Sequence, residues 1–200
     1  MPVIYYSYFS PVTASIAEAE SQEHFLGREL LLHGLNHLHQ ISCNMHTLDT
    51  LISISPSGKP YLKNYPDVHF NISHCNGLVA CVFSKYPVGI DAELPSHFEK
   101  LLIKKVLSSE EKYFFYKTAI TDKLQTQLFF RFWTLKEAYV KKTGTGINIP
   151  LSSISFTFSN TSVTCSDAET KCWQQVLDSG HILSICHDWK ESDTISLNRL

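Results

Sequence analysis

Two carboxylates stand where a short apolar segment ends: Asp91 and Glu93 follow the apolar residues 88–90. Side chains on a β-strand alternate between its two faces, so Asp91 and Glu93 would point the same way if this segment is a strand. A pair of carboxylates is costly to bury unless a cation binds it, and oxygen ligands of this kind suit Mg²⁺. The alternative is a solvated strand end beside a turn, where both carboxylates contact water.

A third carboxylate lies in the aromatic and apolar segment 133–142, which reads W-T-L-K-E-A-Y-V-K-K. Glu137 and Lys141 are four residues apart, so they share one face if the segment is helical. The two side chains could form an ordinary surface ion pair. Because the rest of the segment is apolar, the pattern equally supports a partly buried glutamate with a functional role.

The sequence F-N-I-S-H places Ser73 and His74 side by side before a turn that contains glycine. Neighbours on a strand point to opposite faces, and no G-x-S-x-G segment occurs, so this is not a serine nucleophile with its base. A hydroxyl and an imidazole here could hold a phosphate, or they could be a hydrogen-bonded polar strand end. Lys59, in the turn G-K-P, could likewise contact a phosphate or only solvent, and this turn is not a Walker A loop.

The histidine and cysteine patterns give little support for another metal. His33 and His37 are four residues apart, but no glutamate follows His33, so the zinc-binding motif H-E-x-x-H is absent. The six cysteines form no C-x-x-C pair, and we expect reduced, mostly buried thiols.

The composition excludes several classes of protein. The 200 residues carry a net charge of −2, whereas proteins that bind duplex nucleic acid usually have a strong basic excess. With 44% hydrophobic and 18% charged residues, the chain is not a disordered tail protein. No apolar run approaches the roughly 20 residues of a membrane span, and the N-terminus lacks a signal-peptide pattern. We therefore expect a cytoplasmic protein that binds neither nucleic acid nor membrane.

Helices and strands have to position the candidate residues. Apolar periodicity predicts helical regions at 18–38, 98–117 and 122–143. Short apolar runs bounded by turn residues predict strands at 4–9, 68–73, 78–83, 88–93, 154–158, 171–177 and 182–187. We expect the three strands between residues 68 and 93 to form an antiparallel meander.

The repeated order of helix and strands indicates an α+β fold with two pseudo-symmetric halves, residues 1–95 and 96–200. In each half a helix would pack on a small, largely antiparallel sheet, with the active site between the halves. A chain with two halves needs no second subunit to complete such a cleft, and we expect a monomer.

The order of the motifs resembles one family: G-K-P, F-N-I-S-H, V-G-I-D-A-E and F-W-T-L-K-E-A-Y-V-K-K-T-G-T-G follow one another as in the 4′-phosphopantetheinyl transferases of the surfactin-synthetase type. The resemblance covers residues 58–154, and the chain looks like a compact bacterial member similar to holo-acyl-carrier-protein synthase. It implies an Mg²⁺-dependent enzyme that moves phosphopantetheine from coenzyme A to a serine of an apo acyl or peptidyl carrier protein. The other product would be adenosine 3′,5′-bisphosphate.

The resemblance also assigns roles at the reacting centre. Asp91, Glu93 and Glu137 would be the carboxylates that bind the metal. Glu137 would also remove the proton of the carrier serine, and Lys136 would lie near the reacting phosphate. Glu111 matches a supporting position of the family, although the adjacent Glu110 leaves this assignment open.

A second group of residues would bind coenzyme A. By the same resemblance His74 would contact the 3′-phosphate, with Ser73 and Lys59 close to the nucleotide and Lys141 at the diphosphate. The basic residues that the family uses near its N-terminus have no clear match in this sequence, and Arg28 is the one candidate.

Carrier proteins are typically acidic, so a chain of net charge −2 would need a local basic surface to bind one. Lysines cluster beside apolar residues between positions 101 and 117: Lys104, Lys105, Lys112 and Lys117 with Leu101, Leu102, Phe114 and Phe115. We expect this region to dock the carrier, the alternative being ordinary solvated lysines on an amphipathic helix. Two other functions use the same residues: a non-catalytic module that binds the carrier or coenzyme A, and an Mg²⁺-dependent phosphodiester hydrolase.

Overall fold

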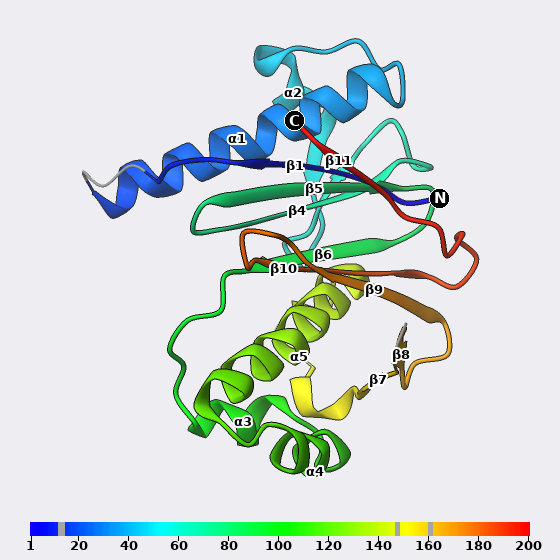
Figure 1. Cartoon of the computed structure of the whole chain (residues 1–200). Helices are drawn as coiled ribbons and strands as arrows, with labels where there is room; N and C mark the ends of the chain where they lie inside the picture. Colours follow the sequence, from blue (N-terminus) through cyan, green and yellow to red (C-terminus); the bar gives the residue numbers. More distant parts are fainter. Residues whose placement is uncertain (12–14, 147–148, 160–161) are drawn as a thin grey trace.

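The structure is a computed structural model that describes residues 1–11, 15–146, 149–159 and 162–200. Its elements form four layers, with a long helix on each outer side and two sheets between them (Figure 1). Separate apolar clusters fill the three spaces between the layers. Among the described residues, no helix is both long and apolar enough to cross a membrane.

The first sheet and its helix belong mainly to the N-terminal half. The sheet has the order β11-β1-β5-β4. Its strands are β1 (Val3–Tyr8), β4 (His69–Cys75), β5 (Leu78–Ser84) and β11 (Ser196–Arg199). Helix α1 (Ile16–His37) begins after Ser15, whose side chain accepts a hydrogen bond from the Glu18 N–H, and it packs on one face of this sheet.

A short excursion joins α1 to β4. It consists of α2 (Met45–Leu51) and the hairpin of β2 (Ile52–Ile54) and β3 (Pro60–Leu62). The turn of this hairpin carries Lys59, with Gly58 at φ 87°, a left-handed conformation that glycine adopts without strain.

The second sheet has the order β6-β10-β9-β8-β7, and its neighbouring strands are antiparallel. The strands are β6 (Val88–Glu93), β7 (Phe156–Phe158), β8 (Val163–Cys165), β9 (Thr170–Val176) and β10 (Ile182–Asp188). Helix α5 (Asp122–Thr143) covers the outer face and ends at Gly144, whose φ is 67°. Helices α3 (Leu101–Val106) and α4 (Ser109–Thr118) and the short 3₁₀ turn η2 (Leu151–Ser153) complete this half.

The structure confirms the expected α+β class and the three helical regions, but it corrects the expected meander. Strands β4 and β5 pair as expected, whereas β6 pairs with β10 of the other half. The division of the chain after residue 95 remains a prediction, with β6 contributing to the sheet of the second half.

The seam between the two sheets lies at β4 and β6, which run side by side but belong to different sheets. Side chains of β4 take the place of a strand partner there. Asn71 Oδ1 accepts a hydrogen bond from the Ile90 N–H at 2.9 Å, and Ser73 Oγ accepts one from the Ala92 N–H at 3.1 Å. Asn71 and Ser73 lie on one face of β4, so they supply acceptors for two alternate N–H groups of β6, those of Ile90 and Ala92.

Candidate active site

The carboxylates of β6 meet helix α5 because the two elements approach closely at Gly89. A Cβ atom on Gly89 would lie 2.1 Å from the carbonyl oxygen of Ala138 and 2.3 Å from the nitrogen of Lys142. Only glycine therefore allows this contact. The next residues on the same face of β6 are Asp91 and Glu93, so they face α5 as the sequence predicts.

Asp91 is the centre of the hydrogen-bond network. Its Oδ1 accepts bonds from Lys141 Nζ at 2.6 Å and from Ser73 Oγ at 3.1 Å, and Lys141 also donates to Ser73 Oγ at 3.1 Å. The residue is 5% exposed, and burial raises the pKa of its carboxyl although Lys141 opposes this shift. Its Oδ2 is buried without a hydrogen-bond partner within the described structure. A buried carboxylate oxygen without a partner is costly, and a cation would satisfy it.

Glu93 and Glu137 are the two partly buried carboxylates beside Asp91. Burial, and then the negative charge of Asp91, raise the pKa of Glu93 to about 7, while Trp133 Nε1 donates a hydrogen bond to Glu93 Oε1 at 3.3 Å. Burial and the charge of Asp91 also raise the pKa of Glu137. The three carboxylates therefore act on one another electrostatically, although Glu137 comes from α5 and the others from β6.

These residues fit a magnesium ion better than a metal that requires a closed set of protein ligands. Among the described residues, no three His, Cys, Asp or Glu side chains converge closely enough to hold an ion by themselves. Mg²⁺ is usually bound by one or two carboxylates, with water and substrate phosphates completing its shell. Two observations favour such an ion here. Asp91 Oδ2 has no hydrogen-bond partner within the described structure, and the charge of Asp91 raises the pKa values of Glu93 and Glu137.

The structure places Lys136 away from this group and so corrects the expectation that it lies near the reacting phosphate. Lys136 is fully buried, and its Nζ is 2.7 Å from Glu111 Oε2 and donates to the carbonyl oxygens of Leu151 and Ile154. Successive helical residues point about 100° apart, so Lys136 and Glu137 face different surroundings. Glu111 is its buried partner, whereas Glu110 is exposed and accepts a hydrogen bond from Ser108 Oγ.

Lys59 lies at the opposite end of β6 from Glu93. Its Nζ donates hydrogen bonds to the carbonyl oxygens of Val88 at 3.0 Å and of Lys142 at 2.9 Å, which ties the β2–β3 turn to the end of α5. Burial, and then the charge of Lys142, lower the pKa of Lys59 to about 8. The ammonium is thus engaged by the protein before any ligand binds.

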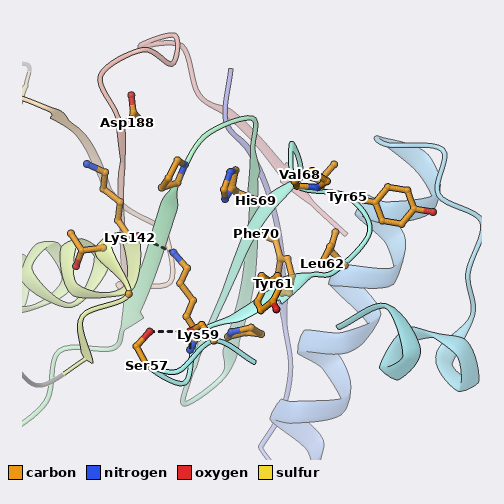
Figure 2. A pocket seen from close by; sticks show the side chains of 16 residues that line it. Ser57, Lys59, Tyr61, Leu62, Tyr65, Val68, His69, Phe70, Lys142 and Asp188 are labelled. Carbon is orange, nitrogen blue, oxygen red and sulfur yellow. Dashed lines mark hydrogen bonds between the residues drawn. The ribbon is translucent and has the colours of Figure 1, made fainter. Parts of the chain in front are cut away.

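A pocket of about 640 Å³ opens beside Lys59 (Figure 2). Its walls come from the β3 hairpin, the start of β4 and the end of α5. One side is apolar and aromatic, with Tyr61, Leu62, Tyr65 and Phe70, while Lys59 approaches from the other. Such a mixed pocket suits a flat, partly polar ring.

His74 lies on the other face of β4 from Ser73 and contacts a residue that the sequence analysis did not select. Its Nδ1 is 2.7 Å from Glu23 Oε2 of α1. Asn71 and Trp133, which also contact the site, lie within the motifs F-N-I-S-H and F-W-T-L-K-E, although neither was predicted individually. The positions of Asn71 and Ser73, two residues apart on one strand, could have indicated that both side chains face the seam. No sequence pattern pointed to Glu23, because it is distant in sequence from His74.

Comparisons with known proteins identify relatives of this chain. The family model of the 4′-phosphopantetheinyl transferase superfamily matches residues 87–186, which contain β6, α5 and β10. The 4′-phosphopantetheinyl transferase Sfp of Bacillus subtilis (strain 168) is 32% identical over 149 residues, covering 69% of this chain and 63% of that protein. The 4′-phosphopantetheinyl transferase psf-1 of Bacillus pumilus is 27% identical over 174 residues, covering 84% of this chain and 71% of that protein.

The matched part of this chain thus spans less than two thirds of the length of Sfp. Among solved structures, the holo-[acyl-carrier-protein] synthase of Thermotoga maritima aligns with 53% of this chain and 64% of its own, at 20% identity and a TM-score of 0.44. A structural likeness of that size supports no conclusion about function.

Proposed function

Since this chain belongs to the 4′-phosphopantetheinyl transferase superfamily, we propose that it transfers the 4′-phosphopantetheine group from coenzyme A to a serine hydroxyl of an apo carrier protein. In this reaction the serine oxygen bonds to the phosphorus that carries the pantetheine, and the bond from that phosphorus to adenosine 3′,5′-bisphosphate breaks. The observation that carries the proposal is the group of Asp91, Glu93 and Glu137, which meet Lys141 where β6 packs on α5.

The proposal includes Mg²⁺ bound by Asp91, Glu93 and Glu137. When bound, the ion would neutralise and orient the diphosphate of coenzyme A. Lys141 would contribute a second positive charge, and it is held beside the carboxylates by Asp91 and Ser73. Catalysis by positioned charge of this kind needs no nucleophile from the enzyme, which agrees with Ser73 and His74 lying on opposite faces of β4.

Glu137 is the proposed acceptor of the serine proton. It extends from α5 and is partly exposed, so an incoming hydroxyl has access to it, whereas Asp91 is buried. Its carboxylate would accept the proton directly or through a bound water.

The nucleotide of coenzyme A would lie along the seam between β4 and β6. The pocket beside Lys59 supports this placement for the base, because it combines an aromatic wall with a cation (Figure 2). His74 would contact the 3′-phosphate from the α1 side of β4, with Ser73 and Lys141 between these two contacts and the metal.

The acidic carrier would dock on α3 and α4. Lys104, Lys105, Lys112 and Lys117 of these helices are charged residues on the same part of the fold as the exposed Leu101. The structure corrects one member of the expected surface, since Phe115 is fully buried in the core. Large apolar side chains nearby are exposed instead: Tyr113, Tyr116 and Ile120. An exposed surface that combines apolar and basic groups is suited to an acidic partner.

We infer a monomer, because β6 and α5 of one chain supply every carboxylate of the proposed site, and we retain the cytoplasmic location expected from the sequence. The test is the intact mass of purified apo carrier proteins after incubation with this protein, coenzyme A and Mg²⁺. A gain of one phosphopantetheinyl group together with release of adenosine 3′,5′-bisphosphate supports the proposal. Binding of coenzyme A without a mass gain on any carrier favours the non-catalytic module, and cleavage of coenzyme A without carrier favours the phosphodiesterase.

A further inference from the structure

The contact between His74 and Glu23 joins the first sheet to helix α1. Ile72 and His74 lie on the face of β4 that packs against α1, where a Cβ atom on Gly27 would be 3.0 Å from Ile72 Cγ2. Glu23 is one helical turn before Gly27 and therefore reaches the next residue on that face, His74. The Glu23 side chain is 17% exposed and that of His74 is 48% exposed. The carboxylate is thus the more enclosed of the two, and the imidazole is accessible.

This contact fixes the chemistry of the imidazole. Nδ1 of His74 is 2.7 Å from a carboxylate oxygen of Glu23 and donates a hydrogen bond to it. The ring nitrogen left for a ligand is Nε2. If a phosphate also accepts a hydrogen bond from Nε2, the ring carries both protons and is an imidazolium between two anions. Glu23 stabilises this state by its charge and orients the ring by its hydrogen bond.

The charge of Glu23 also acts on the residue that follows His74. The pKa of the Cys75 thiol, which follows His74 on β4, is raised to about 12 by burial and by the carboxylates of Glu93, Asp91 and Glu23.

Helix α1 offers little other positive charge to a phosphate at His74. Its sequence contains no lysine, and its arginine, Arg28, donates to Asp49 Oδ1 at 2.6 Å. Among the described residues, and apart from the histidines of α1 such as His24, a phosphate on this side of β4 would depend on His74 and on the group that holds its ring.

We propose that Glu23 is a positioning residue that, through His74, makes this protein select coenzyme A over 3′-dephospho-coenzyme A. The inference rests on the proposed function, because it takes coenzyme A as the donor of the transferred group. It adds a residue of this chain that determines how strongly the 3′-phosphate contributes to binding.

The experiment compares the two donors for the parent protein and for Glu23→Gln, in which the amide oxygen can still accept the bond from Nδ1 but the charge is removed. We expect KM for coenzyme A to rise about fivefold, the difference between a charge-assisted and a neutral hydrogen bond, and KM for 3′-dephospho-coenzyme A to stay within about twofold. Glu20→Gln, at an exposed position one turn earlier on α1, is the matched control and should change neither value. Thermal unfolding of both variants checks that the fold is retained.

An unchanged ratio of the two KM values in Glu23→Gln would show that Glu23 is only structural. A ratio that shifts in favour of coenzyme A would show that Glu23 repels the phosphate, and either result overturns the inference while leaving the transferase proposal intact. If the parent transfers nothing, calorimetric binding of the two compounds gives the same comparison without turnover. Failure of the parent to bind either compound contradicts both the proposed function and this inference.

Discussion

Replacement of Glu111 by glutamine tests whether Lys136 has the buried role in which the structure places it. Glu111 is 2% exposed and Lys136 is 0% exposed. One carboxylate oxygen of Glu111 is 2.7 Å from Lys136 Nζ and accepts from the Ser108 N–H at 2.8 Å, and the other accepts from the Phe156 N–H at 2.8 Å. The pair thus joins α4, α5 and β7 inside the second half.

The expected loss of stability follows from the charge that is left behind. In Glu111→Gln the amide oxygen can still accept a hydrogen bond, but the negative charge is gone, so the Lys136 ammonium stays buried without a counter-charge. Breaking a buried ion pair in this way costs about 3–5 kcal/mol of unfolding free energy. This is a large fraction of the roughly 5–15 kcal/mol that holds a typical domain together. Glu110→Gln is the matched control, and we expect no measurable change because Glu110 is fully exposed.

Urea unfolding followed by tryptophan fluorescence measures both variants. The double variant Glu111→Gln with Lys136→Met removes the unpaired charge, so it should regain at least half of the stability that Glu111→Gln loses. Since Lys136 does not contact the proposed site, this double variant should keep its transfer rate within about tenfold of the parent. Equal stability of the Glu111 and Glu110 variants, or a folded double variant that loses about a hundredfold or more in rate, would refute the placement of Lys136.

Three further predictions concern the seam, the contact of β6 with α5 and the docking surface. Ser73→Ala leaves a buried N–H of β6 without an acceptor, so urea unfolding should show a loss of about 1–3 kcal/mol; unchanged stability would contradict the seam. Gly89→Ala forces its Cβ against the carbonyl oxygen of Ala138, and we expect about 1–3 kcal/mol of destabilisation together with weaker Mg²⁺ binding, measured by unfolding and calorimetry. A variant as stable as the parent would show that α5 can move away without cost. Lys104→Glu combined with Lys105→Glu should raise KM for the carrier and leave KM for coenzyme A unchanged, and steady-state kinetics in which both constants stay the same would exclude this docking surface.

The local elements were predictable because their signals are local. Helix α5 occupies the range 122–143 expected from its apolar periodicity, and it ends where a glycine allows a left-handed residue. Alternation on β6 likewise predicted that Asp91 and Glu93 share a face. The partner of β6 was not predictable from the sequence. Pairing with β10 joins residues about ninety positions apart, and the expected partner β5 and the observed partner β10 have similar apolar patterns.

The site shows the same division between local and distant information. The motif around Glu137 suggested functional roles for both Lys136 and Lys141, but only Lys141 lies beside Asp91. The orientation of Lys136 is decided by Glu111, which the chain brings to it from another helix. Glu23 was missed for a related reason, because its importance depends on the packing of α1 against β4 and not on the residues around it.

The most direct test of the central claim is a calorimetric titration with Mg²⁺ in the presence of coenzyme A, for the parent protein and for Glu137→Gln. In the proposed site, Glu137 of α5 binds the cation together with Asp91 and Glu93 of β6. We therefore expect binding to weaken about tenfold or more in the variant, with unfolding unchanged. Equal affinity for Mg²⁺ in a folded Glu137→Gln protein would contradict a metal site built between β6 and α5.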